Sequence, residues 1–367
     1  MAEYIDFDTH VYEPITVWND YVDPKFRGKG PEFFEDPDGR MKLRLDDQVY
    51  PKMPGHGGFR HIYGPDSKMD RSGNDPAVRL KYMDAHGADV QVIFPTLGMA
   101  AFSTAIRDPE LAVALARAYN RYMGEFTSLD RRRLRGAMLV PANHPEQAAA
   151  EMRRAVREEQ LTIAFMNPTP PANMPWSHPS RDVFWQTANE LGVTIVFHES
   201  TVGAPSHAVG ISRYDTSWPM VYLCTHVVEA MLAMADIILG GTLERFPKLR
   251  VGAAEAHVQW LPGWLSLLDQ QFGAGTKIWN KDSGEFALSL KPSDYFRRQC
   301  FMAAFTDDSM IPDALKTAPD SIVVISDWPH PIAAEYSEAG LRGLEKHPDL
   351  STEQKRKLLT VNPARFL

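Results

Sequence analysis

The sequence predicts an α/β fold of the TIM-barrel type, a (β/α)8 barrel with a long insertion after the first strand. Three observations support this prediction: short apolar strands alternate with helices, eight such strands can be counted, and ionisable residues follow several of them. Alternating units with fully apolar strands indicate a parallel sheet, and eight units close naturally into a barrel. A doubly wound sheet is the alternative, but no Gly-x-Gly-x-x-Gly turn follows an early strand.

The composition is that of an ordinary globular protein. The 367 residues, of which 44% are hydrophobic and 23% charged, fit one barrel domain over residues 1–367 that includes the insertion. The net charge of −8, with no run of Lys or Arg that would form a phosphate-binding stripe, argues against nucleic acid as a partner. We therefore expect a small-molecule substrate.

The features that bear on location favour the cytoplasm. Cys224 and Cys300 are isolated, so a reducing compartment is expected, although a disulfide between them is the alternative. The first residues lack an apolar signal segment. The longest apolar stretch, residues 227–243, is interrupted by Glu229 and Asp236, and we expect it to be too short and too charged to span a membrane.

The first strand, residues 4–10, carries Asp6, Asp8 and His10 at alternating positions. Side chains two residues apart on a strand lie on one face, so three ionisable groups occupy a face where a core strand would carry Val or Leu. Buried charges are tolerated where they are paired or bind a metal. The pattern predicts a metal site, and a solvent-facing strand with incidental acids is the alternative.

Residues 15–75 form the expected insertion, which is rich in Pro, Gly and Asp. Residues 41–45 and 48–50 flank a turn and predict a hairpin. A loop of this length inside a compact domain is usually functional or disordered. Aromatic residues such as Phe59 and Tyr63 favour an ordered lid over the barrel mouth, and a mobile surface insertion is the alternative.

The remaining elements follow from apolar runs and from glycine and proline at their ends. Further strands are expected over residues 89–95, 134–140, 161–167, 193–198, 249–255, 301–305 and 321–327. Helices are expected over residues 77–86, 109–129, 144–159, 182–191, 221–239, 260–272, 311–318 and 351–359.

Polar residues collect where the predicted strands end, and the carboxyl ends of barrel strands hold the active site. The residues at or just after strand ends are Asp8, His10, Asn167, His198, Glu199, Glu255, His257, Asp327 and His330. A lone histidine there is more often a hydrogen-bonded core residue, but several strands that end this way favour a shared site.

Two imidazoles and two carboxylates form the expected ligand set. Its members are Asp8, His10, His198 and Asp327. Such a set suits Zn²⁺, Mn²⁺ or Fe²⁺, and we expect one divalent ion, with zinc as the first choice. With an open position, such an ion lowers the pKa of bound water or polarises a substrate oxygen.

Motifs along the whole chain resemble the amidohydrolase superfamily, and specifically the branch that includes aminocarboxymuconate-semialdehyde decarboxylase and the resorcylate decarboxylases. The motifs are Asp6-x-Asp8-x-His10-x-x-Glu13-Pro14, Phe197-His198, Phe246-Pro247-Lys248-Leu249, Ser326-Asp327-Trp328-Pro329-His330 and Asn362-Pro363-Ala364-Arg365. The resemblance implies a (β/α)8 barrel with one divalent metal on the same four ligands. A homodimer is compatible with it.

The sequence departs from that resemblance in two places. Asp8 stands where the superfamily usually has the first histidine of a His-x-His pair, although a carboxylate also occurs there in the decarboxylase branch. Glu255 stands where the decarboxylases carry the histidine of a Gly-His-x-Gly-Glu motif, and His257 follows two residues later. The second departure weakens the decarboxylase interpretation.

We therefore expect a metal-dependent hydrolase of a small, carboxylated or cyclic organic substrate. Asp327 would act as ligand and base, and Glu255 or His257 would protonate the leaving group. His330 would orient the substrate or Asp327. A nonoxidative decarboxylase of an aromatic or enoic acid is the first alternative, and a metal-free barrel that only binds a ligand is the second.

Two residues after the fifth strand are further candidates for substrate binding. His207 and Arg213 lie in a polar loop and would bind an anionic group of the substrate. Their alternative role is that of solvated loop residues.

Overall fold

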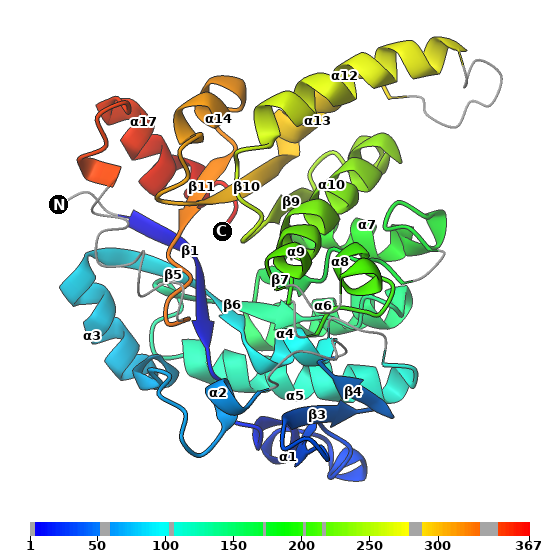
Figure 1. Ribbon diagram of the computed structural model, residues 1–367, viewed down its shortest axis with the longest axis vertical. Coiled ribbons are helices and arrows are strands. Elements are labelled where there is room, and N and C mark those ends of the chain that lie inside the picture. The colour runs from blue at the N-terminus through cyan, green and yellow to red at the C-terminus, as the bar shows by residue number, and fades with distance from the viewer. Residues whose placement is uncertain are drawn as a thin grey trace.

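Eight parallel strands form the central sheet in the computed structural model of the protein, and helices surround it (Figure 1). The structure describes residues 4–51, 59–102, 106–171, 174–200, 203–214, 218–278, 288–330 and 344–367. The strands are β1 (Tyr4–Val11), β5 (Ala88–Pro95), β6 (Leu134–Leu139), β7 (Ile163–Met166), β8 (Thr194–Phe197), β9 (Arg250–Ala253), β10 (Cys300–Phe305) and β11 (Ile322–Ile325). The fold is a (β/α)8 TIM barrel, which confirms the prediction.

The barrel closes where the first strand meets the segment after the last. Thr9 and Trp328 form a parallel bridge. The amide of Asp327 donates to the carbonyl of Asp8 at 2.9 Å, and the amide of His10 donates to the carbonyl of Trp328 at 2.7 Å. These bonds bring the two motifs at opposite ends of the sequence side by side.

Asp6 stabilises the same junction. Its carboxylate accepts hydrogen bonds from the amide of Ser326 at 3.0 Å and from the hydroxyl of Ser326 at 2.6 Å. Burial raises the pKa of Asp6 to about 7, despite these bonds. Through its bonds to Ser326, Asp6 connects β1 to the end of β11. Between Asp6 and Thr9, one extra residue in β1 shifts the register of this strand against β5.

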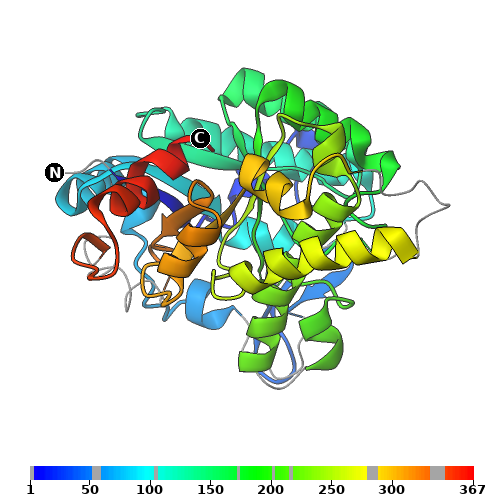
Figure 2. The ribbon, with the colours of Figure 1, turned by 90° about the horizontal axis from the view of Figure 1, so that it is seen from above.

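The outer layer consists of helices that run around the strands in both views (Figures 1 and 2). Its members are α3 (Pro76–His86), α4 (Leu97–Phe102), α5 (Pro109–Thr127), α6 (Pro145–Glu159), α7 (Asp182–Leu191), α8 (Val209–Arg213), α9 (Trp218–Tyr222), α10 (Glu229–Leu239), α11 (Thr242–Arg245), α12 (Leu261–Ile278), α13 (Pro292–Gln299), α14 (Ile311–Thr317), α17 (Thr352–Arg356) and α18 (Asn362–Ala364). Several of these helices, among them α5, α6, α7 and α10, contribute buried apolar residues to the core.

The insertion holds a small antiparallel sheet. Its strands are β2 (Glu32–Glu35), β3 (Met41–Leu45) and β4 (Gln48–Tyr50), and the short helices α1 (Val17–Asp20) and α2 (Arg60–Tyr63) flank it. The pairing of β3 with β4 confirms the predicted hairpin. The sequence missed β2 and α13. Residues 52–58 of the expected lid lie outside the described residues.

Aromatic contacts hold the described part of the insertion against the barrel. The ring of Phe33 lies 5.6 Å from Phe59 and 5.2 Å from Tyr63, and Tyr63 lies 6.4 Å from Tyr12, directly after β1. The insertion is therefore packed where it is described. Its action as a lid stays a prediction, as does the assignment of residues 1–367 to one domain.

The predicted helix over 221–239 is interrupted in the structure. A π-helical segment, Leu223–Val228, separates α9 from α10. The stretch Pro219–Leu239 is long and apolar enough to cross a membrane by length and composition, which differs from our expectation for this region. Buried residues make up 56% of its window, as in a core helix of a globular protein.

Candidate metal centre

Four side chains from three strands meet at the carboxyl end of the barrel. Asp8 and His10 belong to β1, His198 directly follows β8, and Asp327 follows β11. Nε2 of His10 lies 3.2 Å from Oδ1 of Asp8 and 3.1 Å from Oδ1 of Asp327. Nε2 of His198 lies 3.0 Å from Oδ2 of Asp8. All four side chains are buried, so the structure brings together every residue expected as a ligand.

The backbone fixes the tautomer of both imidazoles. Nδ1 of His10 lies 2.9 Å from the carbonyl oxygen of Pro95, and Nδ1 of His198 lies 2.9 Å from that of Glu199. A carbonyl oxygen only accepts, so we assign the ring hydrogen to Nδ1 in each case. Each neutral ring then directs the lone pair of Nε2 toward carboxylate oxygens.

The facing atoms fit a metal ion. Both carboxylate oxygens of Asp8 and Nε2 of His10 and of His198 are buried without a hydrogen-bond partner among the described residues. Each buried polar group left unsatisfied costs about 1–3 kcal/mol. A divalent cation among these lone pairs would satisfy all of them, and histidine ligands held through the other ring nitrogen are usual in metal sites.

The electrostatics of the four side chains also favour positive charge at this point. Burial alone would lower the pKa of His10 and of His198, but the neighbouring carboxylates together raise the pKa of both: Asp8 and Asp327 at His10, and Asp8 and Glu255 at His198. Burial alone would raise the pKa of Asp8 and of Asp327, but the neighbouring imidazoles lower the pKa of both. The cluster stabilises a cation between its carboxylates.

Glu255 borders this cluster. It follows β9, and one of its carboxylate oxygens lies within 4.8 Å of ligand atoms of Asp8, His10 and His198. Its backbone has a φ of 51°, in the left-handed region that few residues other than glycine adopt. The structure therefore brings this expected catalytic residue to the centre. Oε2 of Glu255 lies 3.2 Å from Nδ1 of His226.

His330 contacts Asp327. Nδ1 of His330 lies 2.8 Å from Oδ1 of Asp327, and its Nε2 lies 3.0 Å from the hydroxyl of Thr96. Its ring stacks on His10, with centroids 3.9 Å apart and planes at 19°. Of the two roles expected for His330, the contacts support the orientation of Asp327.

His257 contacts Asp308. Its Nδ1 lies 2.8 Å from Oδ1 of Asp308, which also accepts from the amide of Gln259 at 2.6 Å. Burial alone would lower the pKa of His257, but the nearby carboxylates, Asp308 first among them, together raise it. Glu255 is therefore the better placed of the two acids expected after β9.

The structure does not bring His207 and Arg213 to the buried centre. Both side chains are exposed. Nε2 of His207 lies 2.8 Å from the carbonyl oxygen of Pro170, and Arg213 ends α8. These positions do not support the expected role of the two residues in substrate binding. In a sequence, a polar loop indicates only that its side chains lie near the barrel mouth, and not which way they point.

Sequence reasoning missed His226, which lies in the π-helical segment between α9 and α10. Its side chain is buried and contacts Glu255. The only local signal is Tyr222 four residues earlier, a spacing at which two helix side chains meet. That signal does not reveal a contact with Glu255, which follows 29 residues later in the chain, so His226 could not be selected from the sequence.

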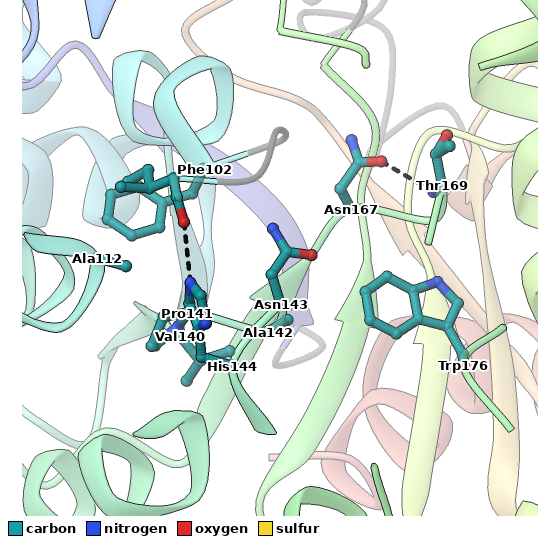
Figure 3. A pocket seen from close by; sticks show the side chains of 11 residues that line it. Phe102, Ala112, Val140, Pro141, Ala142, Asn143, His144, Asn167, Thr169 and Trp176 are labelled. Carbon is teal, nitrogen blue, oxygen red and sulfur yellow. Dashed lines mark hydrogen bonds between the residues drawn. The ribbon is translucent and has the colours of Figure 1, made fainter. Parts of the chain in front are cut away.

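A pocket lies on the β6–β7 side of the barrel mouth (Figure 3). Its lining residues are Phe102, Ile106, Ala112, Val140, Pro141, Ala142, Asn143, His144, Asn167, Thr169 and Trp176. The amide of Asn167 donates to Oε2 of Glu199 at 3.1 Å, and Glu199 follows His198. Asn167 therefore connects this pocket to the strand that precedes His198.

Comparison with known proteins identifies relatives over most of the chain. A family model described as "Amidohydrolase" matches residues 5–367. Gamma-resorcylate decarboxylase of Polaromonas sp. strain JS666 is 25% identical over 260 residues, which cover 68% of this chain and 76% of the relative. The 2-amino-3-carboxymuconate-6-semialdehyde decarboxylase of Dictyostelium discoideum is 24% identical over 308 residues, which cover 82% of this chain and 78% of the relative.

Solved structures share the fold. The crystal structure of an amidohydrolase from Mycobacterium avium subsp. paratuberculosis K-10 has a TM-score of 0.78 at 20% identity, and covers 100% of this chain and 99% of its own. The structure of dihydroxybenzoic acid decarboxylase from Polaromonas sp. JS666, with bound manganese and the inhibitor 2-nitroresorcinol, has a TM-score of 0.65 at 19% identity and covers 100% of this chain and 97% of its own.

Proposed function

The chain belongs to the amidohydrolase family, and we propose that it is a metal-dependent decarboxylase that releases CO2 from a small aromatic or enoic acid. One observation carries the proposal: the relatives that match most of the chain are a resorcylate and an aminocarboxymuconate-semialdehyde decarboxylase. Hydrolysis, which the sequence favoured, has weaker support. The presence of Glu255 at the position where the decarboxylases carry an imidazole still favours hydrolysis.

We assign the metal to Asp8, His10, His198 and Asp327. The fold relative with bound manganese favours Mn²⁺ over the zinc that the sequence led us to expect, and a ligand set of carboxylates and imidazoles accepts either ion. When bound, such an ion binds substrate oxygen atoms and stabilises the negative charge that develops as the carbon–carbon bond breaks.

The chain's own residues then supply one proton to the substrate. In the overall reaction a carboxylate R–CO2⁻ and a proton give R–H and CO2. The bond between the ring or enoic carbon and the carboxyl carbon breaks, and its electron pair stays on the ring or enoic carbon. Glu255, in its protonated form, donates the proton to that carbon and regains one from solvent. No water attacks the substrate, so Asp327 acts as a ligand held by His330 and not as a base.

The resorcylate decarboxylase among the relatives supports an aromatic acid as the substrate, whereas the cavity of about 20 Å³ in Figure 3 has room for about one water molecule. Phe102, Val140 and Trp176 supply apolar surface to that cavity, and Asn143 and Asn167 supply amide groups. In Figure 3 both asparagine side chains lie between the walls of this pocket. Hydroxylated aromatic acids are therefore the first substrates to examine.

The test is a screen of hydroxybenzoates and enoic acids with the Mn²⁺-loaded protein in ¹⁸O-labelled water. We expect CO2 in a 1:1 ratio to the organic product, and no ¹⁸O in that product. Hydrolysis would place ¹⁸O in the organic product without release of CO2. A barrel that only binds ligands would bind the acids and convert none of them.

A further inference from the structure

His226 and Glu255 meet beside the metal centre. Nδ1 of His226 lies 3.2 Å from Oε2 of Glu255, and the exposed fractions of the two residues are 6% and 7%. The imidazole comes from the helical layer after β8, and the carboxylate comes from the end of β9. A contact between these groups at low exposure is a strong electrostatic interaction.

The backbone is irregular on both sides of this contact. His226 lies in the π-helical segment Leu223–Val228, and π-helical turns inside α-helices are frequent at functional sites. Glu255 has a φ of 51°. A residue held in such a conformation destabilises the fold and persists only where the surrounding structure holds it there. A (β/α)8 barrel does not require either of these two backbone irregularities.

The imidazole is itself held in place. The ring of His226 stacks on Tyr222 with centroids 4.2 Å apart and planes at 18°. This stack fixes the plane of the imidazole, so that Nδ1 is directed to a defined position. A carboxyl group with one oxygen in that contact has little freedom to rotate about its side chain.

We infer that His226 is a positioning residue for Glu255. Through the 3.2 Å contact between its Nδ1 and Oε2 of Glu255, the imidazole keeps the carboxyl group at the border of the metal centre, where it meets the substrate carbon. This inference rests on the proposed function for the role of Glu255 as proton donor. It assigns His226 no contact with the metal or with the substrate.

Two isosteric substitutions separate positioning from a merely structural role. The side-chain nitrogen of asparagine lies close to the position of Nδ1, and that of glutamine lies close to Nε2. We expect His226→Asn to keep kcat within a few-fold of the wild-type value. His226→Gln and His226→Ala should lose about 10²-fold in kcat, as expected for misplacement of a catalytic group. KM and metal content should stay unchanged in all three variants.

A matched control is available on α3. His86 stacks on Tyr82 with centroids 3.9 Å apart and planes at 22°, the same spacing and geometry as the pair in the π-helical segment. His86→Asn and His86→Gln should have equal effects on kcat, because no catalytic group depends on that ring. Equal kcat values for His226→Asn and His226→Gln would overturn the inference.

A second measurement does not depend on the reaction. Nitrogen-15 NMR of histidine-labelled protein reports which ring nitrogen carries hydrogen. We expect Nδ1–H at His226 in the wild type and a shift to Nε2–H in Glu255→Ala. A wild-type His226 with hydrogen on Nε2 alone would contradict the inference. If the wild type releases no CO2 while Nδ1–H is found, the proposed function fails and the positioning of Glu255 stands.

Discussion

Nε2 of His10 faces Oδ1 of Asp8 at 3.2 Å, and neither atom has a hydrogen-bond partner among the described residues. Because the carbonyl of Pro95 holds the ring hydrogen on Nδ1, a lone pair faces a carboxylate oxygen inside the barrel. This arrangement is unfavourable by itself and favourable around a cation. The metal centre that we propose follows from this relationship, and the decarboxylation that we propose follows from the relatives.

Substitution of His198 tests the ligand set. His198→Ala removes one imidazole from the centre, and we expect metal affinity to fall by at least about 100-fold while the fold is kept. Elemental analysis beside circular dichroism measures both quantities. His207→Ala is the control, because that side chain is exposed and bonded to the carbonyl of Pro170. Full metal occupancy in His198→Ala would show that the ligand set is wrong.

Removal of the metal should lower thermal stability. The buried carboxylates of Asp8 and Asp327 repel each other without a cation between them, and a ligand that binds only the native state stabilises it. We expect a chelator to lower Tm by roughly 3–6 °C and Mn²⁺ to restore it. Differential scanning calorimetry with chelator, and then with Mn²⁺ in excess, provides the comparison. An unchanged Tm would count against a metal at this site.

Substitution of Glu255 tests the proton donor. Glu255→Gln keeps the shape of the side chain and removes its acid, so turnover should fall about 10²-fold or more at unchanged metal content. His257→Gln is the comparison, since that imidazole faces Asp308, and it should change turnover by less than about 10-fold. If Glu255→Gln is unimpaired and His257→Gln is inactive, the role passes to His257.

The insertion is expected to close over a bound ligand. Amides of β3, β4 and α2 should gain protection from hydrogen exchange when an aromatic acid analogue binds, because closure of a lid excludes water from its backbone. Amides of α6, on the outside of the barrel, serve as the internal reference. Equal exchange of β3, β4 and α2 with and without the analogue would favour the surface-insertion alternative.

The barrel strands could be predicted because each is a short apolar run whose two faces are both covered. The fully apolar composition of such a run, for example Ile322–Ile325 in β11, indicates a strand that is buried on both faces. The strand β2 and the helix α13 lack this signal. The sequence of β2, Glu32–Glu35, has two adjacent aromatics between acids, and that of α13, Pro292–Gln299, is mostly polar. Their pairing and packing come from tertiary contacts.

The candidate ligands could be predicted because each lies at a strand end, and the parallel topology gathers those ends at one rim. The contact between His226 and Glu255 could not, since it depends on a π-helical turn and on a left-handed residue, neither of which has a sequence signature. For His207 and Arg213, the sequence indicated the right loop and not the direction of the side chains. The cytoplasmic location and the homodimer stay predictions.

Anomalous diffraction from crystals of the Mn²⁺-loaded protein, recorded at the manganese edge, tests the central claim most directly. We predict a single strong peak per chain, at about 2.0–2.3 Å from Nε2 of His10, from Nε2 of His198 and from carboxylate oxygens of Asp8 and Asp327. A peak bound by other residues, or a map without a peak between these four side chains, would contradict the account.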